Sequence, residues 1–150
     1  MKADSEVLKI LAAVPEASLG TVEGNGQPYV SAVGVLYETS PNPLEETGRI
    51  FLFLSALARH TRNLAQNPSV SLLFCAREQE SPVHEAPRLT VQGVISLIEN
   101  PDAEQKLRNA YLGRFPRAEI FLNLPDFRFY EVLIREIHWI GGFGKAKTLR

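Results

Sequence analysis

The stretch ASLGTVEGNGQPYVSAVGVLY, residues 17–37, decides the fold, because it predicts two strands joined by a tight turn. Asn25 and Gly26 lie between two apolar runs, and both residue types tolerate the positive φ angles that a two-residue hairpin turn needs. In the returning strand, residues 28–37, apolar or small residues face both sides. A strand with one solvated face would alternate apolar and polar residues. We therefore expect a helix or a partner molecule to cover its second face.

Strands also dominate the rest of the chain. Further apolar segments of strand length follow at residues 50–54, 69–76, 89–98 and 127–140. Helices are predicted at residues 4–14, at 55–66 and after Asn100-Pro101. Gly93 indicates a bulge within the segment 89–98. Strands and helices do not alternate as in a doubly wound sheet, and a closed barrel leaves no open strand edge.

The pattern therefore predicts a mainly-β fold, a six-stranded barrel with peripheral helices. We expect one domain over residues 1–150. It would have a short N-terminal helix at 4–14, the barrel at 17–140 and a C-terminal loop at 141–150. Residues 39–48 and 77–87 are predicted to be surface loops.

Composition excludes several classes of function. The chain has 150 residues, enough for one hydrophobic core, and its formal net charge is −1. It has no long run of one charge sign, so we expect no binding to nucleic acid or to an anionic membrane. The single cysteine, Cys75, forms no intrachain disulfide, which fits a reducing compartment. With neither a signal peptide nor a membrane-spanning segment predicted, we expect a cytoplasmic protein.

The segment LSALARHTRNL, residues 54–64, is the strongest candidate for binding chemistry. A strand there leads directly into a helix, whose first N–H groups favour an anion. Ser55 and Thr61 add hydroxyl donors, and Arg59 and His60 add positive charge near the same turn. An ordinary surface helix with solvated arginines explains the same pattern, and the pattern alone favours that simpler reading.

Other candidate residues are more scattered. Arg88 and Thr90 begin a strand, and Gly141-Gly142-Phe143-Gly144 follows Trp139 with glycines that let backbone approach a flat ligand. The same glycines suit a flexible exit from a strand. The three histidines, His60, His84 and His138, lack metal-ligand spacing, so no metal site is expected.

Several segments together resemble the pyridoxamine 5′-phosphate oxidase-like FMN-binding split barrels, and most closely the haem-utilisation branch of that superfamily. The resemblance covers about residues 5–146. It is carried by GQPYVS (26–31), LSALARHTRNL (54–64), NPSVSL (67–72), RLTVQG (88–93) and GGFGKA (141–146).

This resemblance implies FMN bound at a homodimer interface, with residues from both subunits. Ser31 would face the flavin or its phosphate, and Leu54 and Ser55 would lie along the ring and the ribityl chain. Arg59, His60 and Thr61 would hold the phosphate. The remaining implied contacts are Arg88, Thr90, Trp139, Gly142, Phe143 and Gly144.

Departures from the family pattern narrow the expected function. Where vitamin B6 oxidases carry an arginine-lysine pair at the phosphate, this chain has His60-Thr61, and their C-terminal arginine-x-histidine motif is missing. Haem-degrading relatives carry their haem histidine in a C-terminal extension, whereas no histidine follows His138 here. The resemblance therefore implies an FMN-dependent oxidoreductase acting on an unknown small substrate. The alternatives are a non-catalytic flavin or haem binding and storage protein, and a dimerising module with a vestigial site.

Overall fold

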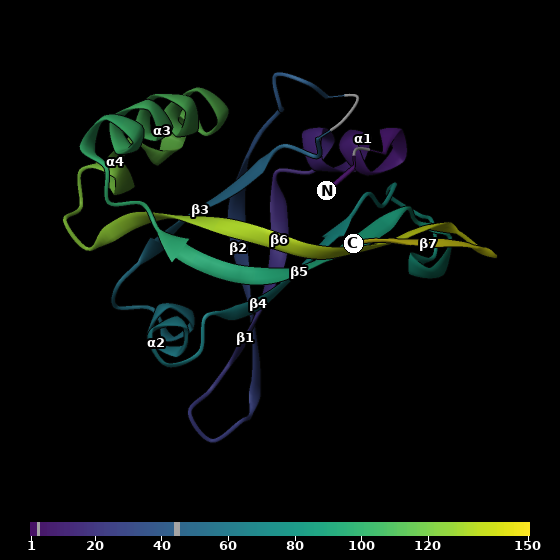
Figure 1. The fold of residues 1–150 in the computed structure, drawn as a ribbon, viewed down its shortest axis with the longest axis horizontal. Coiled ribbons are helices and arrows are strands. Elements are labelled where there is room, and N and C mark those ends of the chain that lie inside the picture. Colours follow the sequence, from purple (N-terminus) through teal and green to yellow (C-terminus); the bar gives the residue numbers. More distant parts are fainter. Residues whose placement is uncertain (3, 44–45) are drawn as a thin grey trace.

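A computed structural model describes residues 1–2, 4–43 and 46–150; residues 44 and 45 of the predicted loop 39–48 lie outside it. Six antiparallel strands form a ring in the order β3-β2-β1-β4-β5-β6, which the pairing of β3 with β6 closes (Figure 1). The predicted six-stranded barrel is thus confirmed. The ring consists of β1 (Glu16–Val22), β2 (Pro28–Glu38), β3 (Arg49–Ser55), β4 (Ser69–Cys75), β5 (Arg88–Leu97) and β6 (Phe127–Gly142).

The predicted β1–β2 hairpin is present, with Leu19 opposite Ser31, but its turn is not the two-residue type. A hydrogen bond from the Glu23 N–H to the Gln27 carbonyl (2.9 Å) closes a loop over residues 24–26, in which Gly26 but not Asn25 has a positive φ. Gly26 has a φ of 86°, a conformation that costs a residue with a Cβ atom far more.

A bulge in the β5–β6 pair helps the ring to close. The register shifts between Gln92 and Gly93, as the sequence predicted. A Cβ atom on Gly93 would collide with the Leu133 carbonyl oxygen. Such a bulge bends a strand and increases its local twist, which a closed barrel requires.

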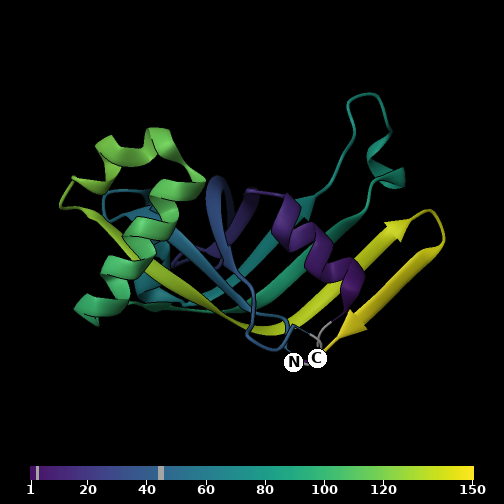
Figure 2. The ribbon, with the colours of Figure 1, turned by 90° about the horizontal axis from the view of Figure 1, so that it is seen from above.

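Two hydrophobic clusters explain why β2 and β3 are apolar on both faces. The first fills the barrel and is covered by α1 (Ser5–Ala13), which contributes Val7, Ile10 and Leu11. The second lies outside the barrel, where Tyr111 of α3 (Pro101–Arg114) packs over Leu36 and Phe53. In Figure 2, α3 covers only one end of the barrel.

The helix cover on β2 therefore ends part-way along the strand. Gly34 lies beneath α3, where a Cβ atom would come within 3.1 Å of the Tyr111 hydroxyl oxygen. Val30 is 65% exposed, and Ala32 is also exposed. The helix that we expected over the second face of β2 therefore covers only one half of this strand.

The helix predicted at residues 55–66 begins four residues later, at Arg59, as α2 (Arg59–Gln66). Ser55 stays at the end of β3, because its hydroxyl donates to Asp126 Oδ2 (2.7 Å) and accepts from the Leu57 N–H (3.1 Å). The short α4 (Glu119–Leu122) follows α3. No helix within residues 1–2, 4–43 and 46–150 has the length and apolar character needed to cross a bilayer.

The C-terminal loop predicted at residues 141–150 is instead a hairpin. β6 runs on to Gly142, and Lys145–Leu149 form a further strand, β7, paired with β6. Gly142 and Gly144 have φ angles of 127° and 77°. The glycines therefore form a turn that reverses the chain, and not a flexible end of the strand. Lys147 of β7 then reaches the N-terminus, where its Nζ lies 2.6 Å from Asp4 Oδ2.

Asp4 is expected to stabilise the fold in two separable ways, because its carboxylate caps α1 and pairs with Lys147. Asp4→Ala removes both contacts, and loss of the cap alone lowers the free energy of unfolding by about 1 kcal/mol. Asp4→Asn keeps the cap and removes only the partly exposed ion pair, so it should cost less. Urea denaturation of the two variants measures the difference, and equal midpoints would show that the cap contributes nothing.

Candidate functional site

The first turn of α2 lies against the β1–β2 hairpin and gathers several predicted residues into one corner. His60 Nδ1 is 2.9 Å from the Ser31 hydroxyl oxygen. One turn further, the Asn63 side-chain amide donates to the Thr21 hydroxyl oxygen (3.0 Å). The structure therefore brings Ser31, His60 and their neighbours together, although 29 residues separate this pair in the sequence.

Two predicted side chains of this corner, Arg59 and Ser55, are engaged by acidic residues of the protein itself. Arg59 forms an ion pair with Glu23, and its guanidinium carbon lies 4.8 Å from the centre of the Tyr29 ring. Ser55 is held by Asp126. Two carboxylates therefore flank the turn that the sequence assigned to a phosphate, and they oppose a second anion there.

Two buried polar atoms in the corner have no hydrogen-bond partner, namely His60 Nε2 and Thr61 Oγ1. Burial lowers the pKa of His60, because the charged imidazolium loses its hydration there. The neutral ring is therefore favoured, and its Nε2 atom is buried away from solvent.

The other predicted residues lie elsewhere. The side chain of Leu54 is 2% exposed in the barrel core. Trp139 packs under Lys147 at the β6–β7 hairpin, with Nζ 4.4 Å from the ring centre, and Phe143 at the hairpin tip is 90% exposed. Arg88 Nη1 donates to the carbonyls of a neighbouring loop.

Within one chain the predicted site is thus split. Figures 1 and 2 place α2 and the β6–β7 hairpin in opposite halves of the molecule along its long axis. A single copy does not bring the α2 group and the hairpin group to one ligand.

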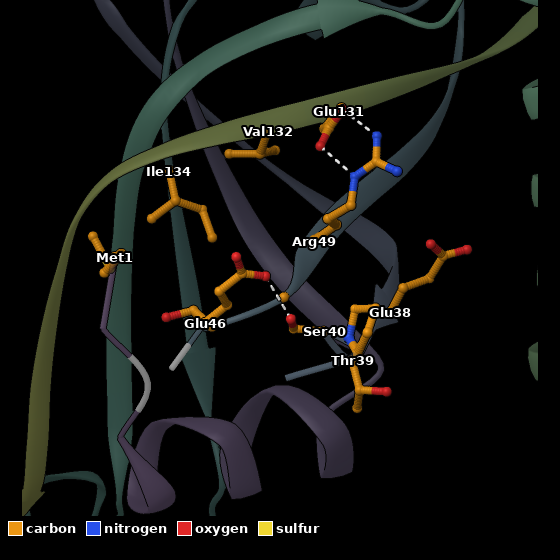
Figure 3. Close-up of a pocket in the computed structure, with 12 residues that line it drawn as sticks. Met1, Glu38, Thr39, Ser40, Glu46, Arg49, Glu131, Val132 and Ile134 are labelled. Carbon is orange, nitrogen blue, oxygen red and sulfur yellow. Dashed lines mark hydrogen bonds and ion pairs between the residues drawn. The ribbon is translucent and has the colours of Figure 1, made fainter. Parts of the chain in front are cut away.

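A cavity of about 510 Å³ lies beside the predicted loop 39–48 and contains none of the predicted site residues among those that line it. Figure 3 shows Arg49 on its wall, where the guanidinium donates two hydrogen bonds of 2.8 Å to Glu131. Ser40 donates to Glu46 on the opposite side (2.6 Å). These polar groups satisfy one another, which favours a structural role for this cavity.

The outer face of the sheet carries a row of side chains of which the sequence analysis assigned only Thr90. Ser18, Leu73, Thr90 and His138 lie directly opposite one another in successive strands, so they form one outward row. His138 Nδ1 is 3.0 Å from the hydroxyl oxygen of Thr148 on β7. Alternation along the last ring strand could have placed His138 outward, but its partner was hidden because β7 was predicted to be loop.

Comparison with known families agrees with this fold over nearly its whole length. Residues 8–150 match the model of the family described as CREG, beta-barrel. The chain belongs to the CREG β-barrel family.

The relatives of this CREG-family barrel include named haem proteins. It is 29% identical over 158 aligned positions to the chloroplastic non-canonical haem oxygenase HOZ of Arabidopsis thaliana, covering 95% of this chain and 48% of that protein. It is 31% identical to the haem oxygenase HutZ of Vibrio cholerae, covering 85% of this chain and 70% of HutZ. The chain thus spans about half the length of the chloroplast protein.

Solved structures support the same relationship. A haem-binding protein from Mycobacterium smegmatis superposes with a TM-score of 0.82 at 27% identity, covering 96% of this chain and 56% of that one. A putative pyridoxamine 5′-phosphate oxidase from Listeria innocua superposes with a TM-score of 0.68 over 92% of this chain and 98% of that one, at 17% identity. The second match shows a shared fold, while the haem-utilisation part of the predicted resemblance is supported by sequence as well.

The prediction that FMN is the cofactor is wrong. The relatives matched along the barrel are named for haem. In the corner at α2, Glu23 and Asp126 already contact Arg59 and Ser55, two of the side chains that the sequence assigned to the flavin. Short sequence motifs could not reveal these two acids, since neither belongs to the segment 54–64.

The half-buried His60 predicts a pH dependence of stability in this CREG-family barrel. Because its pKa is lowered in the folded state, the unfolded chain takes up a proton first as the pH falls. The free energy of unfolding should therefore decrease as the pH drops through about 6.5, by at most about 1.4 kcal/mol per pH unit from this group.

Urea denaturation at pH 7.5 and pH 5.5 measures this effect. His60→Gln, which retains a polar group for Ser31, should show a smaller loss of stability between the two conditions. His84→Gln is the control, because His84 is exposed. Identical pH dependence in wild type and His60→Gln would contradict the assignment.

Proposed function

We propose that this protein binds haem and serves in haem utilisation. The observation that carries the proposal is the similarity to two named haem oxygenases across 85% and 95% of this chain. That similarity extends through the whole ring of strands rather than through one motif. Fold alone would not support a function, because one fold serves many activities.

The outer sheet face offers the surface that a flat apolar macrocycle requires. A groove of about 440 Å³ runs along it, lined in part by Ser18, Ala32, Leu73 and Cys75. These side chains are small or apolar, so a ring system can approach the strands closely. Large side chains such as Phe74 and Leu72 fill the barrel interior.

We further propose that the protein acts as a homodimer through the same face. Val30 and Leu73 are 65% and 42% exposed there, beside the small Ala32 and Gly20. Symmetric self-association is the commonest way to cover such a surface. A second copy would also shield a bound macrocycle from water.

Haem binding is tested directly by titrating the purified protein with ferric haem and recording the visible spectrum. We expect a saturable Soret band at one haem per chain, because a defined site fixes the iron environment. A spectrum that grows linearly without saturation would contradict haem binding. Buffer alone, titrated in parallel, gives the spectrum of unbound haem.

The same haem-loaded sample distinguishes haem binding and storage from haem degradation. Both curated relatives are named haem oxygenases, which favours oxidative loss of the Soret band when a reductant is added in air. A stable reduced spectrum under those conditions would leave a binding and storage role, the alternative reading of the same relatives.

The dimer is tested by placing a charge on the uncovered half of β2. Val30→Glu should yield a monomer in sedimentation velocity, since a buried unpaired carboxylate disfavours association. Ile120→Glu on α4 is a matched control, because Ile120 is 68% exposed. A monomeric wild type, or a Val30→Glu variant that remains dimeric, would contradict the proposed interface.

A further inference from the structure

Only one of the three histidines in this chain is both accessible and oriented. His60 is held by Ser31, and its other ring nitrogen is fully buried. His84 lies in an exposed three-residue turn, Val83–Glu85. His138 stands exposed on β6, and its ring is fixed from one side by Thr148.

The contact with Thr148 fixes the orientation of the His138 ring and allows either tautomer, because a hydroxyl group can donate or accept. When Nδ1–H donates to the Thr148 hydroxyl oxygen, the lone pair of the neutral imidazole is on Nε2. Histidines that bind metals usually donate their second ring N–H in this way, which sets the tautomer and the ring orientation. Nε2 of His138 is then available to an incoming metal ion.

No cluster of three or more metal-binding side chains occurs in the described part of the chain. A conventional metal site built from protein ligands is therefore not supported. Haem iron needs less from the protein, because the macrocycle supplies its own nitrogen ligands and one histidine suffices as the axial ligand. A single well-oriented imidazole on an open face matches that requirement.

The neighbours of His138 on the side of Ile140 suit the macrocycle. Thr90 lies directly opposite on β5, and Ile140 follows two residues along the same face. Leu73 lies beyond Thr90 and is 42% exposed, and Ala146 on β7 lies opposite Ile140. Toward Ile140, a planar ring over His138 would thus rest on methyl and methylene groups, whereas toward Glu136 it would meet Gln92 and the Glu136–Arg150 ion pair.

Arg88 provides a cation at the edge of this surface. It lies opposite Ile140, diagonal to His138 across the strand pair. Its Nη1 donates to the carbonyl oxygens of Val83 (2.8 Å) and Ala86 (3.1 Å), which orients the guanidinium. Both bonds leave from one nitrogen, so the donors on Nε and Nη2 can bind a carboxylate.

We propose that His138 is the axial ligand of the haem iron and that Arg88 holds a propionate carboxylate of the same haem. The macrocycle then lies on the outer face of β5 and β6. This inference rests on the proposed function, haem binding, and goes beyond it by assigning the ligand within the barrel itself.

The test compares ferric haem titrations of wild type, His138→Ala and His84→Ala, followed by visible and electron paramagnetic resonance spectra. His138→Ala should lose the imidazole-ligated signature and bind haem about tenfold more weakly or worse. Free imidazole should restore the signature in that variant. His84→Ala should retain both the affinity and the spectrum of wild type.

Arg88→Gln tests the carboxylate contact separately. It should weaken binding while leaving the iron spectrum unchanged, whereas Arg62→Gln on the exposed side of α2 should do neither. Circular dichroism of each apoprotein confirms folding, and His138→Gln serves if the alanine variant misfolds.

The possible failures are distinguishable. Wild type that binds no haem overturns the proposed function and this inference together. Wild type that binds haem, with a His138→Ala variant of identical spectrum and affinity, overturns the ligand assignment alone. A lost signature that imidazole does not restore would also contradict direct ligation by His138.

Discussion

The pairing of β3 with β6 is the constraint on which the rest of this structure depends. It joins strands that begin 78 residues apart and turns an open sheet into a ring. β3 must then be apolar on both faces, since its inner residues fill the barrel and Phe51 and Phe53 support α3. The bulge at Gly93 serves the same closure, because an unbroken β5–β6 register would bend less.

Closure also determines where a ligand can bind. The packed interior leaves the outer sheet face as the accessible surface, and α3 covers only the end of that face near Gly34. The exposed remainder runs from Val30 through Leu73 to His138. The proposed haem site and the proposed dimer contact therefore share one face, which would make the second copy part of the wall around the ligand.

Much of the fold could be predicted from local patterns. The hairpin at Asn25-Gly26 and the helix that begins after Asn100 are indicated by signals contained within a few residues, and both elements occur as expected. Other features depend on partners that are distant in the chain. α2 begins late because Ser55 is bound by Asp126, 71 residues away. β7 was missed because Gly142 and Gly144 fit either a loose end or a turn, and only pairing with β6 decides between them.

The same limit explains the error about the cofactor. Arginine, histidine and hydroxyl side chains at a helix start predict an anion site only if nothing in the protein already binds them. Glu23 comes from the hairpin and Asp126 from the segment before β6, so folding adds two acids that the motif itself does not contain. His138 is the converse case. It looks isolated in sequence, and only the strand that returns beside it supplies the Thr148 hydroxyl that orients the ring. In a closed barrel, residues on neighbouring strands therefore decide whether a side chain can bind a ligand. Some neighbours already bind the side chain, as Glu23 and Asp126 do, and others orient it, as Thr148 orients His138.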